Sequence, residues 1–63
     1  MITIELPDGT KQTAKAGTVE DILRNLELNP YEILVLQNDE LLLADDAVED
    51  GAELKLVSIV HGG

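Results

Sequence analysis

The residues with the clearest chemical potential close the sequence as Val60-His61-Gly62-Gly63. A terminal glycine offers a free carboxylate, and because glycine lacks a Cβ, a pair of glycines can pass through a narrow enzyme channel. Fully stretched, the last three residues span about 10 Å. The carboxylate is an anion at neutral pH, since α-carboxyl groups have pKa values of about 3.5, so it must be activated before acyl transfer. We therefore expect a reactive acyl terminus at Gly63, with Gly62 giving the tail clearance.

No other set of residues suggests chemistry by the chain itself. His61 is the only histidine and there is no cysteine, so neither a nucleophilic constellation nor the usual zinc site can be assembled. Asp45-Asp46 and Glu49-Asp50 lack the ligand spacing of a calcium loop and predict a solvated acidic loop. No glycine-rich segment leads into Lys-Ser or Lys-Thr. We predict no catalytic residue, no metal site, no cofactor bound by the chain, and no enzymatic activity.

Composition sets the class of protein and the kind of partner. The chain has 63 residues with 13 acids, 4 bases, a net charge of -9 and 44% hydrophobic residues, which fits one small folded domain. Its charge repels nucleic-acid phosphates and anionic lipids, so we expect neither as a partner, and a cationic protein surface instead. Since the sequence has no apolar run of about 18 residues and no basic leader, we expect a cytoplasmic protein.

The beginning of the sequence predicts a β-hairpin. Apolar residues alternate with polar ones at Ile2, Ile4 and Leu6. Pro7-Asp8-Gly9-Thr10 has turn composition, and the polar segment from Lys11 to Ala16 suits an edge strand. We expect Gly17 to end this strand.

A short amphipathic helix is predicted next. Thr18 and Asp21 have the spacing of a capping box, so the helix should begin there. Its apolar stripe consists of Val19, Ile22, Leu23 and Leu26. Glu20 and Arg24 are placed to form an ion pair on the opposite side, and Asn29-Pro30 is expected to stop the helix.

The remaining elements read as strands. Apolar runs at 33–36 and 41–43 predict two short strands around a turn at 37–40. The acidic, turn-rich segment 44–52 has Val48 as its one plausible anchor, and the segment from Leu54 onward predicts a last strand. The order is strand, strand, helix, strand, strand, strand, so a one-layer sheet should carry a single helix.

Such a sheet cannot hide all of its apolar side chains. If Leu54 and Leu56 face the helix, then Val57 and Ile59 lie on the other side of the pleat with Lys55. Only one of the pairs Leu34/Leu36 and Ile33/Val35 can face the helix. An exposed apolar patch of this kind marks partner docking. We assign the docking surface to Val57, Ile59, Val60, Leu34 and Leu36, with Ile33 and Val35 as the alternative pair.

This order of elements, ending in Gly62-Gly63, resembles the β-grasp, ubiquitin-like sulfur carriers: ThiS of thiamine synthesis, MoaD of molybdopterin synthesis and the small archaeal modifier proteins. Residues 28–36 (Leu-Asn-Pro-Tyr-Glu-Ile-Leu-Val-Leu) are similar to the helix exit and third strand of the archaeal modifiers, and residues 48–52 (Val-Glu-Asp-Gly-Ala) to a loop of ThiS. Asn38-Asp39 departs from the Asn-Gly common in ThiS relatives.

The resemblance implies an α+β, ubiquitin-like β-grasp domain over residues 1–60, with a mixed four- to five-stranded sheet, one helix on one face, and a flexible diglycine tail at 61–63. It also implies that a ubiquitin-activating-like enzyme adenylates Gly63, using ATP and Mg²⁺, and that a persulfide converts the adenylate to a thiocarboxylate. A sulfur-acceptor synthase or thiolation enzyme then receives the sulfur, for thiamine, molybdopterin or tRNA thiolation.

Two alternatives stay open at this point. The chain could be a ubiquitin-like modifier, joined through Gly63 to lysines of target proteins, with Lys11, Lys15 and Lys55 as acceptors for self-linked chains. It could also be a β-grasp binding module with an unreactive tail. The isolated chain turns over no substrate in any of these interpretations.

Overall fold

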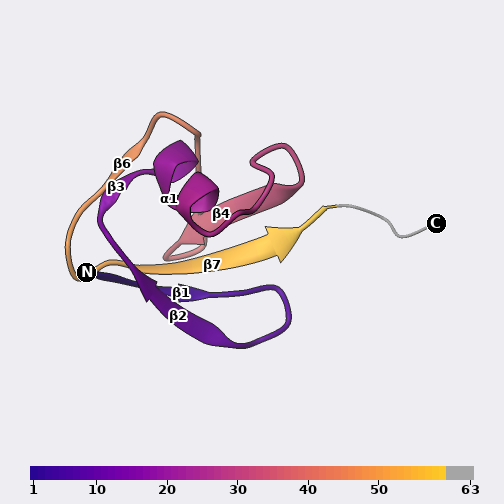
Figure 1. Cartoon of the computed structure of the whole chain (residues 1–63), viewed down its shortest axis with the longest axis horizontal. Coiled ribbons are helices and arrows are strands. Elements are labelled where there is room, and N and C mark those ends of the chain that lie inside the picture. Colours follow the sequence, from indigo (N-terminus) through magenta and orange to yellow (C-terminus); the bar gives the residue numbers. More distant parts are fainter. Residues whose placement is uncertain (60–63) are drawn as a thin grey trace.

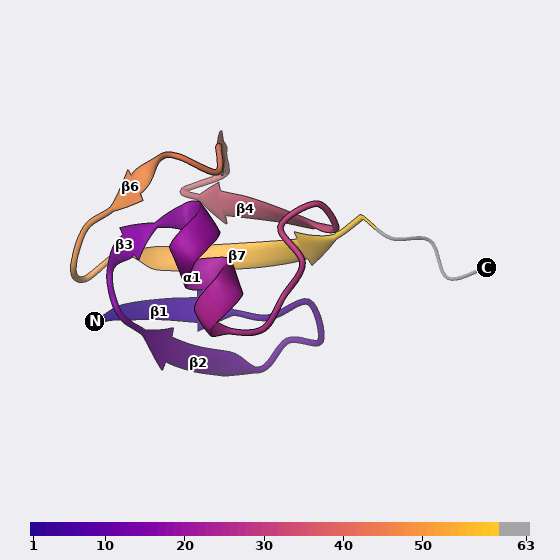
Figure 2. The ribbon, with the colours of Figure 1, turned by 45° about the horizontal axis from the view of Figure 1, so that its top comes forward.

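The computed structural model describes residues 1–59 and shows a main sheet with a helix across one of its faces (Figures 1 and 2). In chain order the elements are β1 (Ile2–Glu5), β2 (Lys11–Ala14), β3 (Gly17–Thr18), α1 (Val19–Asn25), β4 (Ile33–Gln37), β5 (Glu40–Leu42), β6 (Ala47–Val48) and β7 (Glu53–Ser58). The main sheet has five strands in the order β2-β1-β7-β4-β5, and β3 pairs with β6 in a second, two-stranded sheet.

The main sheet is mixed. β1 and β7 run parallel, whereas the pairs β1-β2, β4-β7 and β4-β5 are antiparallel. The last strand therefore lies in the middle of the sheet, between the first strand and β4. The predicted mixed sheet of four to five strands with one helix on one face is confirmed.

The core fills the space between the sheet and α1. Strand residues of one parity point toward the helix, and the apolar stripe of the helix meets them. The buried apolar residues are Ile2, Ile4, Val19, Ile22, Leu23, Val35, Val48, Leu54 and Leu56. This set confirms the prediction that Leu54 and Leu56 face the helix. It also confirms that Val48 is the residue of the acidic segment that packs in the core.

The hairpin between β1 and β2 turns at the predicted residues. The Gly9 amide donates to the Leu6 carbonyl at 2.9 Å, and Gly9 adopts φ +91°, a left-handed conformation that glycine tolerates best. The Asp8 carboxylate accepts from the Thr10 hydroxyl at 2.7 Å and from the Thr10 amide at 3.0 Å. These two hydrogen bonds, the hydroxyl first, hold the pKa of Asp8 below its ordinary value.

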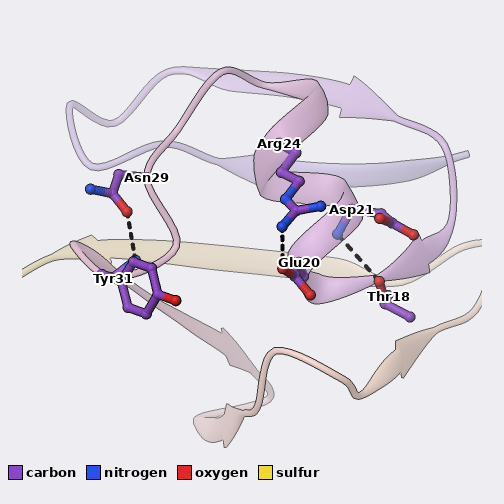
Figure 3. A network of polar contacts seen from close by, with 6 residues as sticks. All are labelled: Thr18, Glu20, Asp21, Arg24, Asn29 and Tyr31. Atoms are coloured by element: carbon purple, nitrogen blue, oxygen red, sulfur yellow. Dashed lines mark hydrogen bonds and ion pairs between the residues drawn. The ribbon is translucent and has the colours of Figure 1, made fainter.

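Helix α1 begins as predicted. The Thr18 hydroxyl caps it by accepting from the Asp21 amide at 3.2 Å, and Arg24 pairs with Glu20 at 2.6 Å (Figure 3). The pair is largely exposed, so it contributes a few tenths of a kcal/mol at most, about the value for exposed helix pairs.

The end of α1 differs from the prediction. The helix stops at Asn25, well before Asn29-Pro30, because Glu27 adopts a left-handed conformation with φ 60°. The Glu27 amide donates to the Arg24 carbonyl and the Leu28 amide to the Leu23 carbonyl, which is the Schellman pattern. Asn29 instead forms a turn, in which its side-chain oxygen accepts from the Tyr31 amide at 3.0 Å (Figure 3).

A second difference concerns Gly17 and the acidic loop. The predicted edge strand ends at Ala14, and Gly17 does not simply break it but opens β3, which pairs with β6 through Gly17 and Val48. The loop carbonyls of Asp46 and Ala44 then accept from the amides of Val19 and Glu20 at 3.0 and 2.9 Å. Backbone donors at the start of α1 are thereby satisfied by a segment distant in sequence.

Candidate functional site

The face of the sheet away from α1 carries an apolar cluster, which we call the open-face patch. Directly opposed residues point to the same face, and β4-β7 pairs Leu34 with Val57, next to the buried pair Val35 and Leu56. Leu34 and Val57 therefore point away from the helix. The patch consists of Leu34, Leu36, Leu41, Val57 and Ile59. The exposed fractions of Leu34, Leu41 and Ile59 are 36%, 54% and 43%.

The structure decides between the two predicted β4 pairs. Val35 is 2% exposed and packs against the core together with Ile33, so Leu34 and Leu36 are the outward pair. They lie on the same face as Val57 and Ile59, which confirms the predicted arrangement, while the docking role of this face stays a prediction. The predicted docking residue Val60 and the tail residues His61, Gly62 and Gly63 lie outside the described residues.

Leu41 is a patch residue that the sequence analysis missed. It is opposed to Leu36 in the β4-β5 register. That register follows from the two-residue turn at Asn38-Asp39, where both residues have positive φ values of 53° and 66°. The turn type was the available signal, because it fixes which residue of the run 41–43 stands opposite Leu36.

The remaining side chains of this face are polar and balanced in charge. Glu5 is aligned with Lys11 on one side and with Lys55 on the other, and Glu53 lies on the same face. These two acids and two bases cancel. The other 11 acids and 2 bases, out of 13 and 4 in all, therefore carry the whole net charge of -9. The open face is thus the neutral face of a strongly acidic protein.

The open-face patch includes Ile59, the last residue that the structure describes. The Ile59 amide donates to the Glu32 carbonyl at 3.0 Å, which extends the β4-β7 pairing one residue beyond the end of β7 at Ser58. The last described residue is therefore held against the loop before β4. A partner that covers the whole patch therefore contacts Ile59, the last residue that the structure describes.

Residues 1–59 contain neither a metal-binding cluster nor a helix that could span a membrane. In this range no three histidine, cysteine, aspartate or glutamate side chains are grouped so that they could hold a metal ion. No helix in the same range has the length and apolarity needed to cross a membrane.

A five-stranded mixed sheet with one helix on one face and the final strand at its centre defines a ubiquitin-like β-grasp domain. The sequence profile of the ThiS family matches residues 4–63, so the chain belongs to the ThiS family. It is also 27% identical over 63 residues to the sulfur carrier protein TtuB of Thermus thermophilus, with 98% of this chain and 97% of that protein covered.

Proposed function

We propose that this protein is a sulfur carrier whose Gly63 carboxylate is adenylated by a partner enzyme and then converted to a thiocarboxylate. The observation that carries the proposal is the family match, because it extends through Gly62 and Gly63. The similarity to a protein named as a sulfur carrier supports the same role. In this proposal Gly63 bears the sulfur, Gly62 gives clearance in the partner's channel, and the chain is a substrate rather than an enzyme.

The proposed chemistry has three steps, each of which balances. First, a carboxylate oxygen of Gly63 attacks the α-phosphorus of ATP and pyrophosphate leaves, which gives an acyl adenylate. The terminal sulfur of a persulfide then attacks the acyl carbon and AMP leaves, after which a thiol cleaves the sulfur-sulfur bond, forming a disulfide and releasing the thiocarboxylate. The partner supplies ATP, Mg²⁺ and the cationic groups that stabilise the developing charge.

In this proposal the open-face patch is the surface that the adenylating enzyme binds. Three of its members keep more than a third of their surface exposed, and its strand neighbours are neutral overall. An apolar surface of this kind can be desolvated at little cost, whereas the acidic remainder of the molecule cannot. A sulfur-acceptor enzyme then takes the loaded carrier; thiamine, molybdopterin and tRNA thiolation pathways are all compatible, and the cytoplasm is the proposed compartment.

The test is mass spectrometry of the chain after incubation with the adenylating enzyme of its host, ATP and a persulfide source. We expect the C-terminal peptide to exchange one oxygen for one sulfur. A chain lacking Gly62-Gly63 should remain unmodified while keeping the fold, which circular dichroism can check. An unmodified full-length chain, under conditions in which the enzyme adenylates a known carrier, would contradict the proposal.

Conjugation to lysine is a second candidate, because it starts from the same acyl adenylate. Lys11, Lys15 and Lys55 are all exposed and could accept the acyl group in self-linked chains. Expression of a tagged chain in its host tests this: a modifier gives a ladder of higher-mass species that disappears when Gly62-Gly63 is deleted. Restoration of a sulfur-dependent product without any ladder favours the carrier alone.

A further inference from the structure

The central strand β7 is paired on both sides over only part of its length. At Glu53–Lys55 it has β1 on one side, and at Lys55–Ser58 it has β4 on the other. The β1-β7 register ends at Glu5 opposite Lys55. In this parallel register the Leu56 amide still points at the Glu5 carbonyl, so the β1 side of β7 is free from the Leu56 carbonyl through Ser58, roughly 7 Å of strand edge.

The residue after Leu6 explains why the parallel pairing stops. Pro7 occupies the place where the next donor of β1 would lie, and proline has no N–H. The turn that follows, with the Leu6 amide bonded to the Thr10 carbonyl at 2.7 Å, then directs the chain into β2. Figures 1 and 2 show this turn at the end of the molecule where β7 also ends.

Backbone geometry fixes which groups of β7 face this free edge. The Ile59 amide donates to the Glu32 carbonyl, so it points toward β4. Successive amides of a strand point to opposite sides, so the Ser58 amide points toward β1. Within residues 1–59 no carbonyl outside the strands accepts a hydrogen bond from it. The Ser58 amide is thus a strand donor that the fold leaves available.

A cleft opens along the same edge. It has a volume of about 500 Å³, and the turn residues Pro7 and Gly9 form one wall while Leu56, Val57 and Ser58 form the other. Val57 lines this cleft and also belongs to the open-face patch, so the cleft adjoins the proposed binding surface. A chain that enters this cleft would run beside the last three residues of β7.

We propose that the free edge of β7 at Leu56–Ser58 accepts an extended segment of the adenylating enzyme, which adds a short strand to the sheet. The inference rests on the proposed function for the identity of the partner. The free Ser58 amide can donate to a carbonyl of an extended peptide backbone. We therefore infer that the bound segment is extended, since exposed strand edges recognise peptides by backbone pairing. The added strand would fix the part of β7 that comes directly before the tail in the sequence.

The experiment compares two substitutions at one position. Ser58→Pro removes the amide donor, whereas Ser58→Ala keeps the donor and removes only the hydroxyl. We expect Ser58→Pro to weaken binding to the adenylating enzyme by about three- to tenfold, the value of one backbone hydrogen bond, and Ser58→Ala to stay within about twofold of the original chain. If the proline variant unfolds, a synthetic chain with lactic acid at position 58 can replace it in this experiment. Lactic acid removes the same N–H group but does not introduce the proline ring.

Amide hydrogen exchange gives the second measurement. In the free protein the Ser58 amide should exchange fast between protected neighbours at Val57 and Ile59, and in the complex it should become protected. Adenylation of the original chain with no change at Ser58 overturns this inference and leaves the proposed function standing. No adenylation at all overturns both. Protection of Ser58 in a dimer of the free chain, detected by sedimentation, assigns the edge to a second copy and also overturns the inference.

Discussion

Asp8 places a carboxylate in the turn between β1 and β2, where it accepts two hydrogen bonds from Thr10. Both bonds favour the charged form, so the pKa of Asp8 in the folded chain lies below its value in the unfolded chain. The stabilisation from this carboxylate is therefore fully present above the unfolded pKa and is lost as pH falls through the lower, folded pKa.

The Asp8→Asn variant tests this contribution, because asparagine keeps an acceptor oxygen but cannot titrate. We expect the difference in urea midpoint between the original chain and the variant to be constant near neutral pH and to shrink as the pH falls below about 4. NMR titration of the Asp8 carboxyl carbon should give a midpoint below that of an ordinary aspartate. A midpoint at or above the ordinary value would contradict the argument.

Glu27 holds a backbone conformation that suits glycine better. Its φ of 60° ends α1, and a left-handed conformation costs a residue with a Cβ about 1–2 kcal/mol. We expect Glu27→Gly to raise the free energy of unfolding by about 0.5–1 kcal/mol, after allowance for the greater freedom of glycine in the unfolded chain. Thermal denaturation would measure it.

Glu27→Gln is the matched control for Glu27→Gly. It removes the same negative charge near the C-terminal end of α1 but keeps the Cβ. If both variants are stabilised equally, charge and not backbone conformation is responsible.

At the scale of elements, the β3-β6 pair ties the acidic loop to the start of α1. Val48 is 4% exposed and is the buried residue of β6, while its neighbour Ala47 is exposed. We expect Val48→Ala to cost about 1.5–3 kcal/mol, from two lost methyl groups and the cavity they leave. Ala47→Ser should change stability by less than about 0.5 kcal/mol.

Hydrogen exchange distinguishes local from general loosening in the Val48→Ala variant. The amides of Val19 and Glu20 donate to carbonyls of the acidic loop, so they should exchange faster when β6 loosens. Unchanged exchange at these two amides would show that Val48 contributes to the core but does not hold the loop.

Substitutions in the open-face patch on the β4-β7 pair should weaken binding to the adenylating enzyme. Leu34→Ser and Val57→Ser remove opposed apolar side chains from this face, and each should weaken binding to the adenylating enzyme by at least about fivefold. Thr13→Ser, on the polar part of the same face, is the control and should leave binding unchanged. If all three variants bind equally well and keep their thermal midpoints, the adenylating enzyme binds a surface other than the open-face patch.

At the scale of the whole molecule, net charge and docking face are separated. The radius of gyration of the chain is 10.7 Å, similar to the Debye length of about 10 Å at 0.1 M salt, so part of the acidic surface still acts on an approaching partner at that salt and less of it acts as salt rises. We expect the association rate with a basic enzyme to fall as salt rises, while the dissociation rate changes little because the patch itself is apolar. Stopped-flow and surface-binding kinetics between about 0.05 and 0.5 M NaCl measure the two rates. A dissociation rate that rises as steeply as the association rate falls would place charged pairs inside the interface.

Features that depend on neighbouring residues were predictable from the sequence. Alternation in β1 and β7, the cap at Thr18 and the apolar stripe of α1 are local patterns, and they predicted most of the core and the position of the helix among the main strands, although not β3 and β6. The reactive terminus at Gly62-Gly63 was predicted from the sequence alone and stays a prediction, because it lies outside the described residues. Glu27 was missed because glutamate carries no local signal for a left-handed helix end.

The tertiary structure decided the features that require pairing between distant segments. The β4-β7 register made Leu34 and Leu36 the outward pair and left Ile33 and Val35 facing the helix, a choice the unbroken apolar run could not make. Pairing also created β3 and β6 and placed Pro7 beside the free edge of β7. Residue types determine which side chains can be buried or reactive. A shift of one residue in strand register, however, exchanges the two faces of a strand. Only the assembled sheet therefore fixes which surface is exposed to a partner.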